Sequence, residues 1–210
     1  MTQPFTSQSV AEQDIVDLFI QSNKSFARWY RRRRKLIQQP VVFQVSDDLD
    51  LPAMTRQVTP DFQLPSELNL AVGTHLIWLR RDHVVPGVVA HELEHCIMAE
   101  EGWPKLTNTL GRTLRVPPHD KEQGLINVGE VFFNCVLDLE IDRRLLAFQL
   151  HNGRDLNGWK DEMRKVTDEN TVKRLFALIP PGGCKTPAAA RQCFAAFIAL
   201  TESHDLFRVK

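Results

Sequence analysis

The sequence predicts an α+β fold, in which a small, mostly antiparallel sheet packs with several helices. Short runs rich in β-branched and aromatic residues indicate strands at Val41–Val45 and His75–Arg80, and a third at Leu68–Val72. Longer segments repeat their apolar residues at three- and four-residue spacing, which is the periodicity of a helix with one buried face. A few strands beside several helices, without an internal repeat, favour the α+β class.

Five helices are expected, covering about residues 11–35, 84–98, 125–149, 160–178 and 187–202. Glycine and proline mark a long loop at 106–124 and turns at 152–158 and 180–183. With 43% hydrophobic residues in a chain of 210, a substantial core can form. We therefore expect one compact unit, with residues 1–40 as a helical extension packed on a domain covering residues 41–210.

The charge balance excludes a strong overall attraction to nucleic acid or to a membrane surface. Lys and Arg together number 26, as do Asp and Glu, so the formal net charge is zero. No apolar run approaches the length of about 18 residues that a membrane-spanning helix requires, and the polar start of the chain lacks the apolar core of a signal peptide. These features predict a cytoplasmic protein that has no membrane partner.

The pentapeptide His91-Glu92-Leu93-Glu94-His95 is the most informative motif in the chain. Residues four apart lie on the same face of a helix, so His91 and His95 can each offer a ring nitrogen to one metal ion, with Glu92 beside it. Pro86 suits a first helical turn, and Gly102 followed by Pro104 suits a helix end. The alternative is that both histidines are ordinary, partly buried residues flanked by acids that form salt bridges.

The next long helix carries a candidate third ligand. Its polar residues recur at four-residue spacing, opposite an apolar face: Glu130, Asn134, Asp138 and Asp142. Acids in this arrangement suggest a ligand helix that packs across the first one. They are also compatible with an exposed charged edge that pairs with Arg143 and Arg144.

HExxH followed by a helix with an acidic ligand resembles the gluzincin branch of the zincin metallopeptidases. The string Asp138-Leu139-Glu140-Ile141-Asp142-Arg143 is similar to a segment of the CaaX-prenyl-protease-like peptidases. The Asn134-x-x-x-Asp138-x-x-Ile141-Asp142 pattern resembles an element of the putative bacterial metallopeptidase domain found ahead of von Willebrand A-like domains. Both similarities imply a zincin-like fold and place the third ligand on Asp138.

Two departures from these families leave an alternative open. Gluzincins use Glu as the third ligand, so Glu130 competes with Asp138; Asn134 would then support a ligating histidine. The putative bacterial domain also has a histidine five residues after the second histidine of HExxH, whereas this chain has Glu100 there.

The ligand set implied by the resemblance predicts hydrolytic chemistry. Zn²⁺ held by His91, His95 and Asp138 would polarise a carbonyl oxygen and acidify water, and Glu92 would act as the general base. Asp142 or Asn134 would accept the second N–H of a ligating histidine. The strand at His75–Arg80 is expected to offer an open edge to an extended peptide or protein substrate.

An oxyanion stabiliser is also expected, commonly a His, Tyr or Arg from elsewhere in the chain. The candidates are His119, which we favour, and Tyr30, His75, His83, His151 and His204.

The remaining basic and sulfur-containing residues suggest structural roles. Arg31 to Lys35 form a basic cluster at the end of the first helix, where cations complement the helix dipole; the alternative is a weak patch for nucleic acid, a partner that we do not expect. The four cysteines, which are Cys96, Cys135, Cys184 and Cys193, are interpreted as reduced, and no structural zinc site is indicated.

The function that the sequence favours is that of a zinc-dependent metalloendopeptidase, a hydrolase of the HExxH type. An alternative is a zincin-fold binding or assembly protein, for example in a phage or a stress response, whose metal site is not catalytic. A third interpretation is an interaction module that binds no metal.

Overall fold

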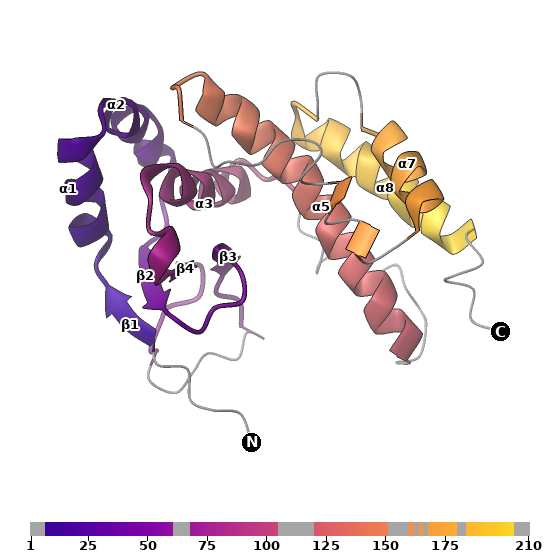
Figure 1. The fold of residues 1–210 in the computed structure, drawn as a ribbon, viewed down its shortest axis with the longest axis horizontal. Coiled ribbons are helices and arrows are strands. Elements are labelled where there is room, and N and C mark those ends of the chain that lie inside the picture. Colours follow the sequence, from indigo (N-terminus) through magenta and orange to yellow (C-terminus); the bar gives the residue numbers. More distant parts are fainter. Residues whose placement is uncertain are drawn as a thin grey trace. The chain divides into compact units, whose positions relative to one another are not determined.

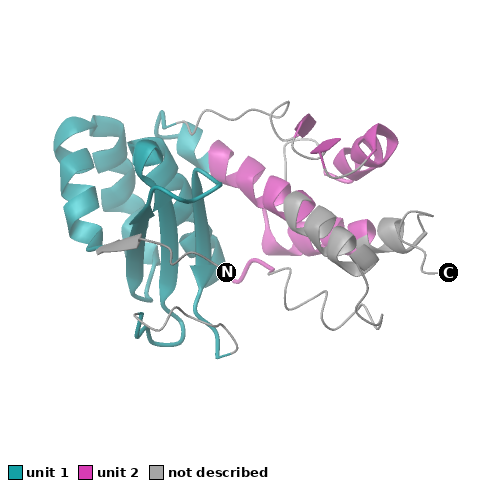
Figure 2. Cartoon of the chain, turned by 60° about the horizontal axis from the view of Figure 1, so that its bottom comes forward, with its two compact units in different colours: residues 1–100, 144–152 teal, residues 101–143, 153–210 magenta. Residues whose placement is uncertain are grey.

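The computed structural model describes residues 7–60, 68–104, 120–150, 160–161, 164–165, 168–179 and 184–203. The chain divides into two compact units, of which unit 1 comprises Met1–Glu100 and Arg144–Asn152, and unit 2 comprises Glu101–Arg143 and Gly153–Lys210 (Figure 2). The expected extension, residues 1–40, falls within unit 1. The α+β class is confirmed, because the chain combines several helices with a small mixed sheet.

Unit 1 contains a mixed sheet with the strand order β1-β2-β4-β3 (Figure 1). Its strands are β1 (Ser7–Val10), β2 (Val41–Ser46), β3 (Ala53–Gln57) and β4 (His75–Arg80). The β1–β2 and β3–β4 pairings are antiparallel, and the central β2–β4 pairing is parallel. The predicted strands at Val41–Val45 and His75–Arg80 are thereby confirmed.

The predicted strand at Leu68–Val72 is wrong. These residues lead into a turn in which Thr74 N–H donates to Ala71 O and Gly73 has a φ of 96°, a value that favours glycine. The sheet uses β3 instead, although its sequence AMTRQ is neither strongly apolar nor rich in β-branched residues. Pairing with β4 supplies what the local sequence lacks, as is common for strands.

The predicted single helix over residues 11–35 is also wrong, because Asn23 interrupts it. The chain forms α1 (Glu12–Ser22), α2 (Lys24–Arg33) and the short 3-10 helix η1 (Arg34–Leu36). Asn23 adopts an extended backbone with a φ of −133°, and its side chain accepts the Phe26 N–H at 2.9 Å. It therefore caps α2, a role for which asparagine is well suited.

The predicted HExxH helix is confirmed as α3 (Pro86–Glu100), which follows the 3-10 helix η2 (Arg81–His83). It ends before Gly102, whose φ is 77°. In the sheet, Phe43, Ile77 and Thr55 are neighbours in register, so their side chains share one face. α3 packs on this face and also contacts α2 (Figure 1).

Glu94 joins three elements of unit 1 from inside the core. Its carboxylate is completely buried and accepts the Trp29 Nε1–H at 2.9 Å. Arg33 of α2 donates to both carboxylate oxygens at 2.7 Å, and Arg144 lies 3.4 Å from one of them. Burial of this acid is possible because charged and polar donors surround it.

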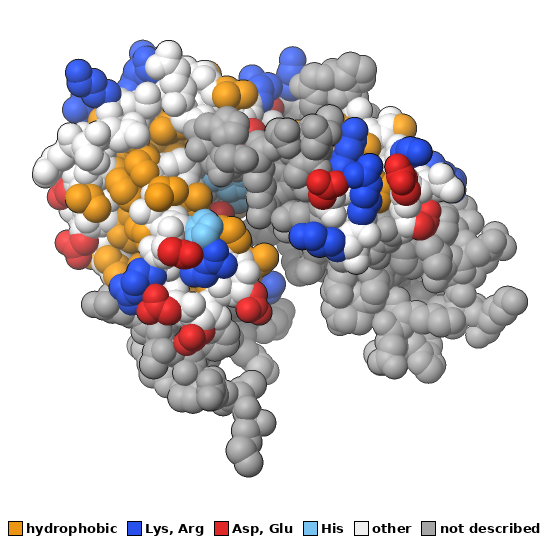
Figure 3. Space-filling model, viewed as in Figure 1, with side chains coloured by type: hydrophobic (Ala, Val, Ile, Leu, Met, Phe, Trp, Pro, Cys, Tyr) orange, Lys and Arg blue, Asp and Glu red, His pale blue; other side chains and the backbone are white. Residues whose placement is uncertain are grey.

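Two residues of the basic cluster at Arg31 to Lys35 form ion pairs within unit 1. Arg33 pairs with Glu94, and Arg34 donates to both carboxylate oxygens of Glu12. Tyr30, one of the oxyanion candidates, also donates to Glu12, at 2.9 Å. Acidic and basic side chains are interspersed over the face that Figure 3 shows. These contacts favour a structural role for the cluster.

Unit 2 is helical in the part that the structure describes. It contains α5 (Asp120–Leu146) up to Arg143, α7 (Glu169–Ala177) and α8 (Pro187–Ser203). Phe132 of α5 stacks on Phe197 of α8 with ring centroids 4.9 Å apart, and Phe133 meets Phe194 at 5.3 Å. Among the described residues, no helix is long and apolar enough to cross a membrane.

Two predicted boundaries in this region were wrong. α5 begins at Asp120, within the stretch expected to be a loop, of which residues 106–119 lie outside the described ones. A new helix begins at Glu169, where a continuous helix over 160–178 was expected. Asp168 caps it by accepting the backbone N–H groups of Asn170 and Thr171. The predicted turns at 152–158 and 180–183 lie outside the described residues.

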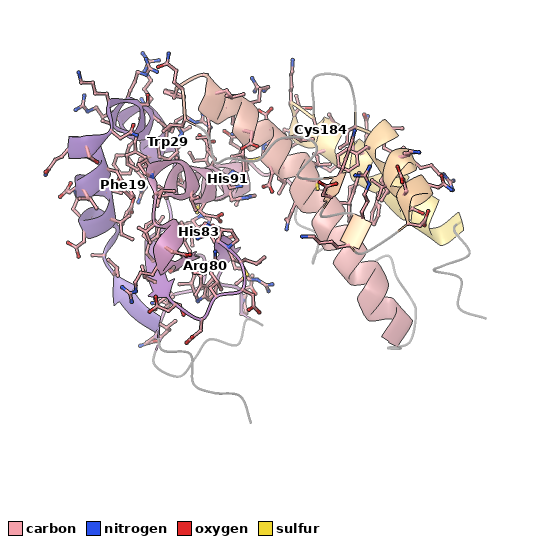
Figure 4. All side chains as sticks on the ribbon, viewed as in Figure 1. Phe19, Trp29, Arg80, His83, His91 and Cys184 are labelled. Carbon is pink, nitrogen blue, oxygen red and sulfur yellow. The ribbon has the colours of Figure 1, made fainter. Side chains whose placement is uncertain are left out.

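All four cysteines are buried thiols, and Cys96 and Cys135 were expected to be core residues. The Sγ atoms of Cys184 (Figure 4) and Cys193 lie 3.0 Å apart, and the Cys193 thiol donates to Leu178 O. Burial, together with the contact to Cys193, raises the pKa of Cys184 from 9.0 to about 12. Burial also raises the pKa of Cys96.

These thiols are expected to resist alkylation in the native protein. Iodoacetamide at pH 8 should modify none of the four cysteines before unfolding and all four in denaturant, which mass spectrometry measures directly. Because the unfolded chain loses the Cys184 proton near pH 9.0 and the folded chain only near pH 12, this thiol should lower stability as pH rises through that window. Rapid labelling of native Cys184 would contradict its burial.

Candidate metal centre

α3 presents two imidazoles and a carboxylate together. His91, Glu92 and His95 each offer one ligand atom, and these atoms all lie within 4.8 Å of one another. The two rings are 5.0 Å apart between centroids and inclined by 73°. His91 and Glu92 are each 7% exposed, and His95 is half-buried. The group is thus largely shielded from solvent.

The donor types and their spacing fit a metal ion. Imidazole nitrogens are ligands that Zn²⁺ takes at about 2 Å, so an ion would draw the two histidines slightly closer together and leave the Glu92 carboxylate beside it. Among the described residues, this is the only group of three or more His, Cys, Asp or Glu side chains that could hold one metal ion together. The prediction that one helical face brings His91, Glu92 and His95 together is therefore confirmed.

Glu92 is held by a residue that the sequence did not single out. The Thr55 hydroxyl donates to Glu92 Oε2 at 2.7 Å and lies 3.3 Å from the Glu92 backbone oxygen. Thr55 comes from β3, 37 residues away along the chain. No local pattern marks it, because its role depends on β3 packing beside α3.

Among the described strands, the edge strand beside the candidate centre is β3 and not β4. The prediction that His75–Arg80 is an edge strand was wrong, since β4 lies between β2 and β3. The hydrogen bonds Arg80 N–H to Pro52 O and Val58 N–H to Thr74 O show which β3 residues face β4. In an antiparallel pair the bonded residues alternate, so the main-chain groups of Ala53, Thr55 and Gln57 point away from the sheet.

The sequence candidates on α5 belong to unit 2, and the structure describes each unit by itself. Asp138 is 5% exposed, whereas Asn134 is exposed and Asp142 half-buried. The Glu130 side chain lies outside those that are described. Arg143 forms a two-fold ion pair with Glu140, which is buried. The choice of Asp138 or Glu130 as third ligand stays a prediction.

The candidate oxyanion stabilisers fall into two groups. His75 is buried and its Nε2 lies 3.1 Å from Glu100 Oε1, which also accepts the Gln39 N–H. Glu100 stands where the putative bacterial metallopeptidase domain has its further histidine. In this chain it contacts His75 of β4. His119, which the sequence favoured, lies outside the described residues with His151 and His204.

His83, the third described candidate beside Tyr30 and His75, belongs to a charged cluster just before α3. Its Nδ1 lies 2.7 Å from Asp82 Oδ1, and Arg80 approaches both residues. The hydrogen bond from His83, followed by that from Arg80, lowers the pKa of Asp82 to about 2. Arg80, His83 and His91 are labelled in Figure 4, on β4, η2 and α3.

Comparisons with protein-family models, with curated proteins and with solved structures found no match to this chain. The resemblance to zincins accordingly rests on the motif residues themselves.

Proposed function

We propose that this protein is a zinc-dependent metallopeptidase of zincin type. The observation that carries the proposal is that the ligand atoms of His91, Glu92 and His95 all lie within 4.8 Å of one another on a largely buried part of α3. The donor set suits zinc, and the acid between the two histidines suits a general base.

When bound, zinc would supply Lewis acidity, which polarises a carbonyl oxygen and makes water a better nucleophile at neutral pH. Glu92 takes the proton of the attacking water and later passes it to the departing amine. Its low exposure favours this role, because bulk water has little access to the carboxylate.

The open edge of β3 is the proposed binding surface for an extended peptide. Main-chain groups of Ala53 and Thr55 face outward there, and Thr55 contacts Glu92. A peptide added as a further strand would gain main-chain hydrogen bonds next to the base, with little demand on its sequence.

Asp138 is the proposed third ligand, with Glu130 as its competitor. The spacing of the acids on α5 supports a carboxylate from this helix, and the low exposure of Asp138 suits a ligand better than a solvated edge. Asp142 or Asn134 would then orient a ligating histidine.

Metal content by mass spectrometry tests the proposal. Wild-type protein, offered zinc and then dialysed, should hold about one zinc per chain. His91→Ala should lose it, and so should only one of Asp138→Ala and Glu130→Ala. His83→Ala is the matched control, because His83 lies outside the pentapeptide and pairs with Asp82. Wild-type protein that stays free of zinc would overturn the proposal.

A further inference from the structure

The contact between Thr55 and Glu92 joins the proposed substrate edge to the proposed base. The hydroxyl carries one proton, and the 2.7 Å distance to Glu92 Oε2 is much shorter than the 3.3 Å to the backbone oxygen. The carboxylate therefore receives the hydrogen bond. This hydrogen bond uses one of the two carboxylate oxygens of Glu92.

Glu92 needs such a restraint because it lies close enough to act as a ligand. Its oxygen is within 4.8 Å of the ligand atoms of both His91 and His95. A carboxylate bound directly to the metal would give up the lone pair with which it accepts a proton from water. The same acid can thus serve as a base or as a ligand, and its side-chain position decides between the two.

We propose that Thr55 is a positioning residue that keeps Glu92 beside the metal without letting it ligate. This inference rests on the proposed metallopeptidase function and adds a residue to it. Threonine suits the task because its branched side chain restricts χ1, so the hydroxyl direction is set by the strand.

The position of Thr55 in β3 adds a second consequence. Its main-chain groups point outward at the open edge, while its side chain points to α3. A peptide that pairs with this edge therefore docks on the residue that holds the base. Such a peptide would lie close to Glu92.

Two substitutions separate the hydroxyl from the shape of the side chain. Thr55→Val removes the hydrogen bond and keeps the branched shape, whereas Thr55→Ser keeps the hydroxyl. With dye-quenched casein as the probe, Thr55→Val should lower kcat by about 10- to 100-fold with a smaller change in KM, and Thr55→Ser should stay within about threefold of wild type. Thr74→Val, which removes another buried threonine hydroxyl of unit 1, is the matched control.

The visible absorption spectrum of the cobalt-loaded protein provides a readout that needs no substrate. Thr55→Val should change this spectrum, because the released Glu92 can reach the metal, and Thr55→Ser should not. In a Glu92→Gln background, Thr55→Val should have no further effect.

Equal kcat values for Thr55→Val and Thr55→Ser would overturn the proposal, as would a Thr55→Val spectral change that persists in the Glu92→Gln background. A wild-type protein that binds cobalt but cleaves nothing would contradict the peptidase function alone, and the spectra would still decide the role of Thr55.

Discussion

Glu92→Gln is expected to lower peptide hydrolysis by at least about 100-fold while leaving the metal in place. Glutamine has nearly the same shape and can still accept the Thr55 hydroxyl, but it cannot take a proton from water at neutral pH. Cleavage of dye-quenched casein and the zinc content of the same preparation measure the two effects together.

Glu101→Gln is the matched control, since it makes the same chemical change at an exposed position just after α3. It should retain wild-type cleavage and zinc. A Glu92→Gln protein that cleaves at the wild-type rate would show that another group takes the proton. Zinc lost together with activity would instead indicate that Glu92 is a ligand.

Glu94→Gln is expected to lower the free energy of unfolding by about 3 kcal/mol or more, although it lies in the same pentapeptide. The carboxylate is fully buried and is bonded to Trp29 and to both ends of the Arg33 guanidinium fork. A neutral amide cannot balance the Arg33 charge. Its NH₂ group would also face the N–H donors of Trp29 and Arg33, where the carboxylate had an accepting oxygen. Urea denaturation followed by circular dichroism measures the change.

The comparison for this prediction is Glu169→Gln, which alters an exposed acid with ion pairs to Arg164 and Lys173 at 3.6 and 3.5 Å. Exposed pairs contribute little, so the change there should stay within about 0.5 kcal/mol. Equal denaturation midpoints for the two variants would argue against the Glu94 network as a major source of stability.

The two acids of the pentapeptide show how far the sequence alone could lead. Four-residue spacing on a helix was sufficient to predict that His91 and His95 share a face, because this geometry is local. Spacing from HExxH also marked Glu92. From the sequence, Glu94 had a role only in the alternative interpretation, as a flanking acid that forms salt bridges. Packing against α2 revealed that this salt bridge is to Arg33 and that Glu94 also joins Trp29 in the core.

Strands were harder to predict than helices, because a strand depends on partners that are distant in the sequence. β4 has β-prone residues and was found from the sequence, but its place between β2 and β3 depends on partners far along the chain. β3 has a weak local signal and was missed, although it forms the edge beside α3. The interruption between α1 and α2 at Asn23 was also missed. Apolar residues continue at helical spacing on both sides of Asn23, so the sequence pattern does not show that its side chain caps a new helix.

The sequence by itself determined the helix that carries the candidate metal ligands: its start near Pro86, its end before Gly102 and the histidine pair with Glu92 between them. These features follow from backbone periodicity and from the preferences of proline and glycine, which act over a few residues. Tertiary structure alone decided that β3 is an edge strand of the described sheet and that Thr55 contacts Glu92. Strand order and contacts between distant segments arise from burying the whole core at once, and no short stretch of sequence contains that information.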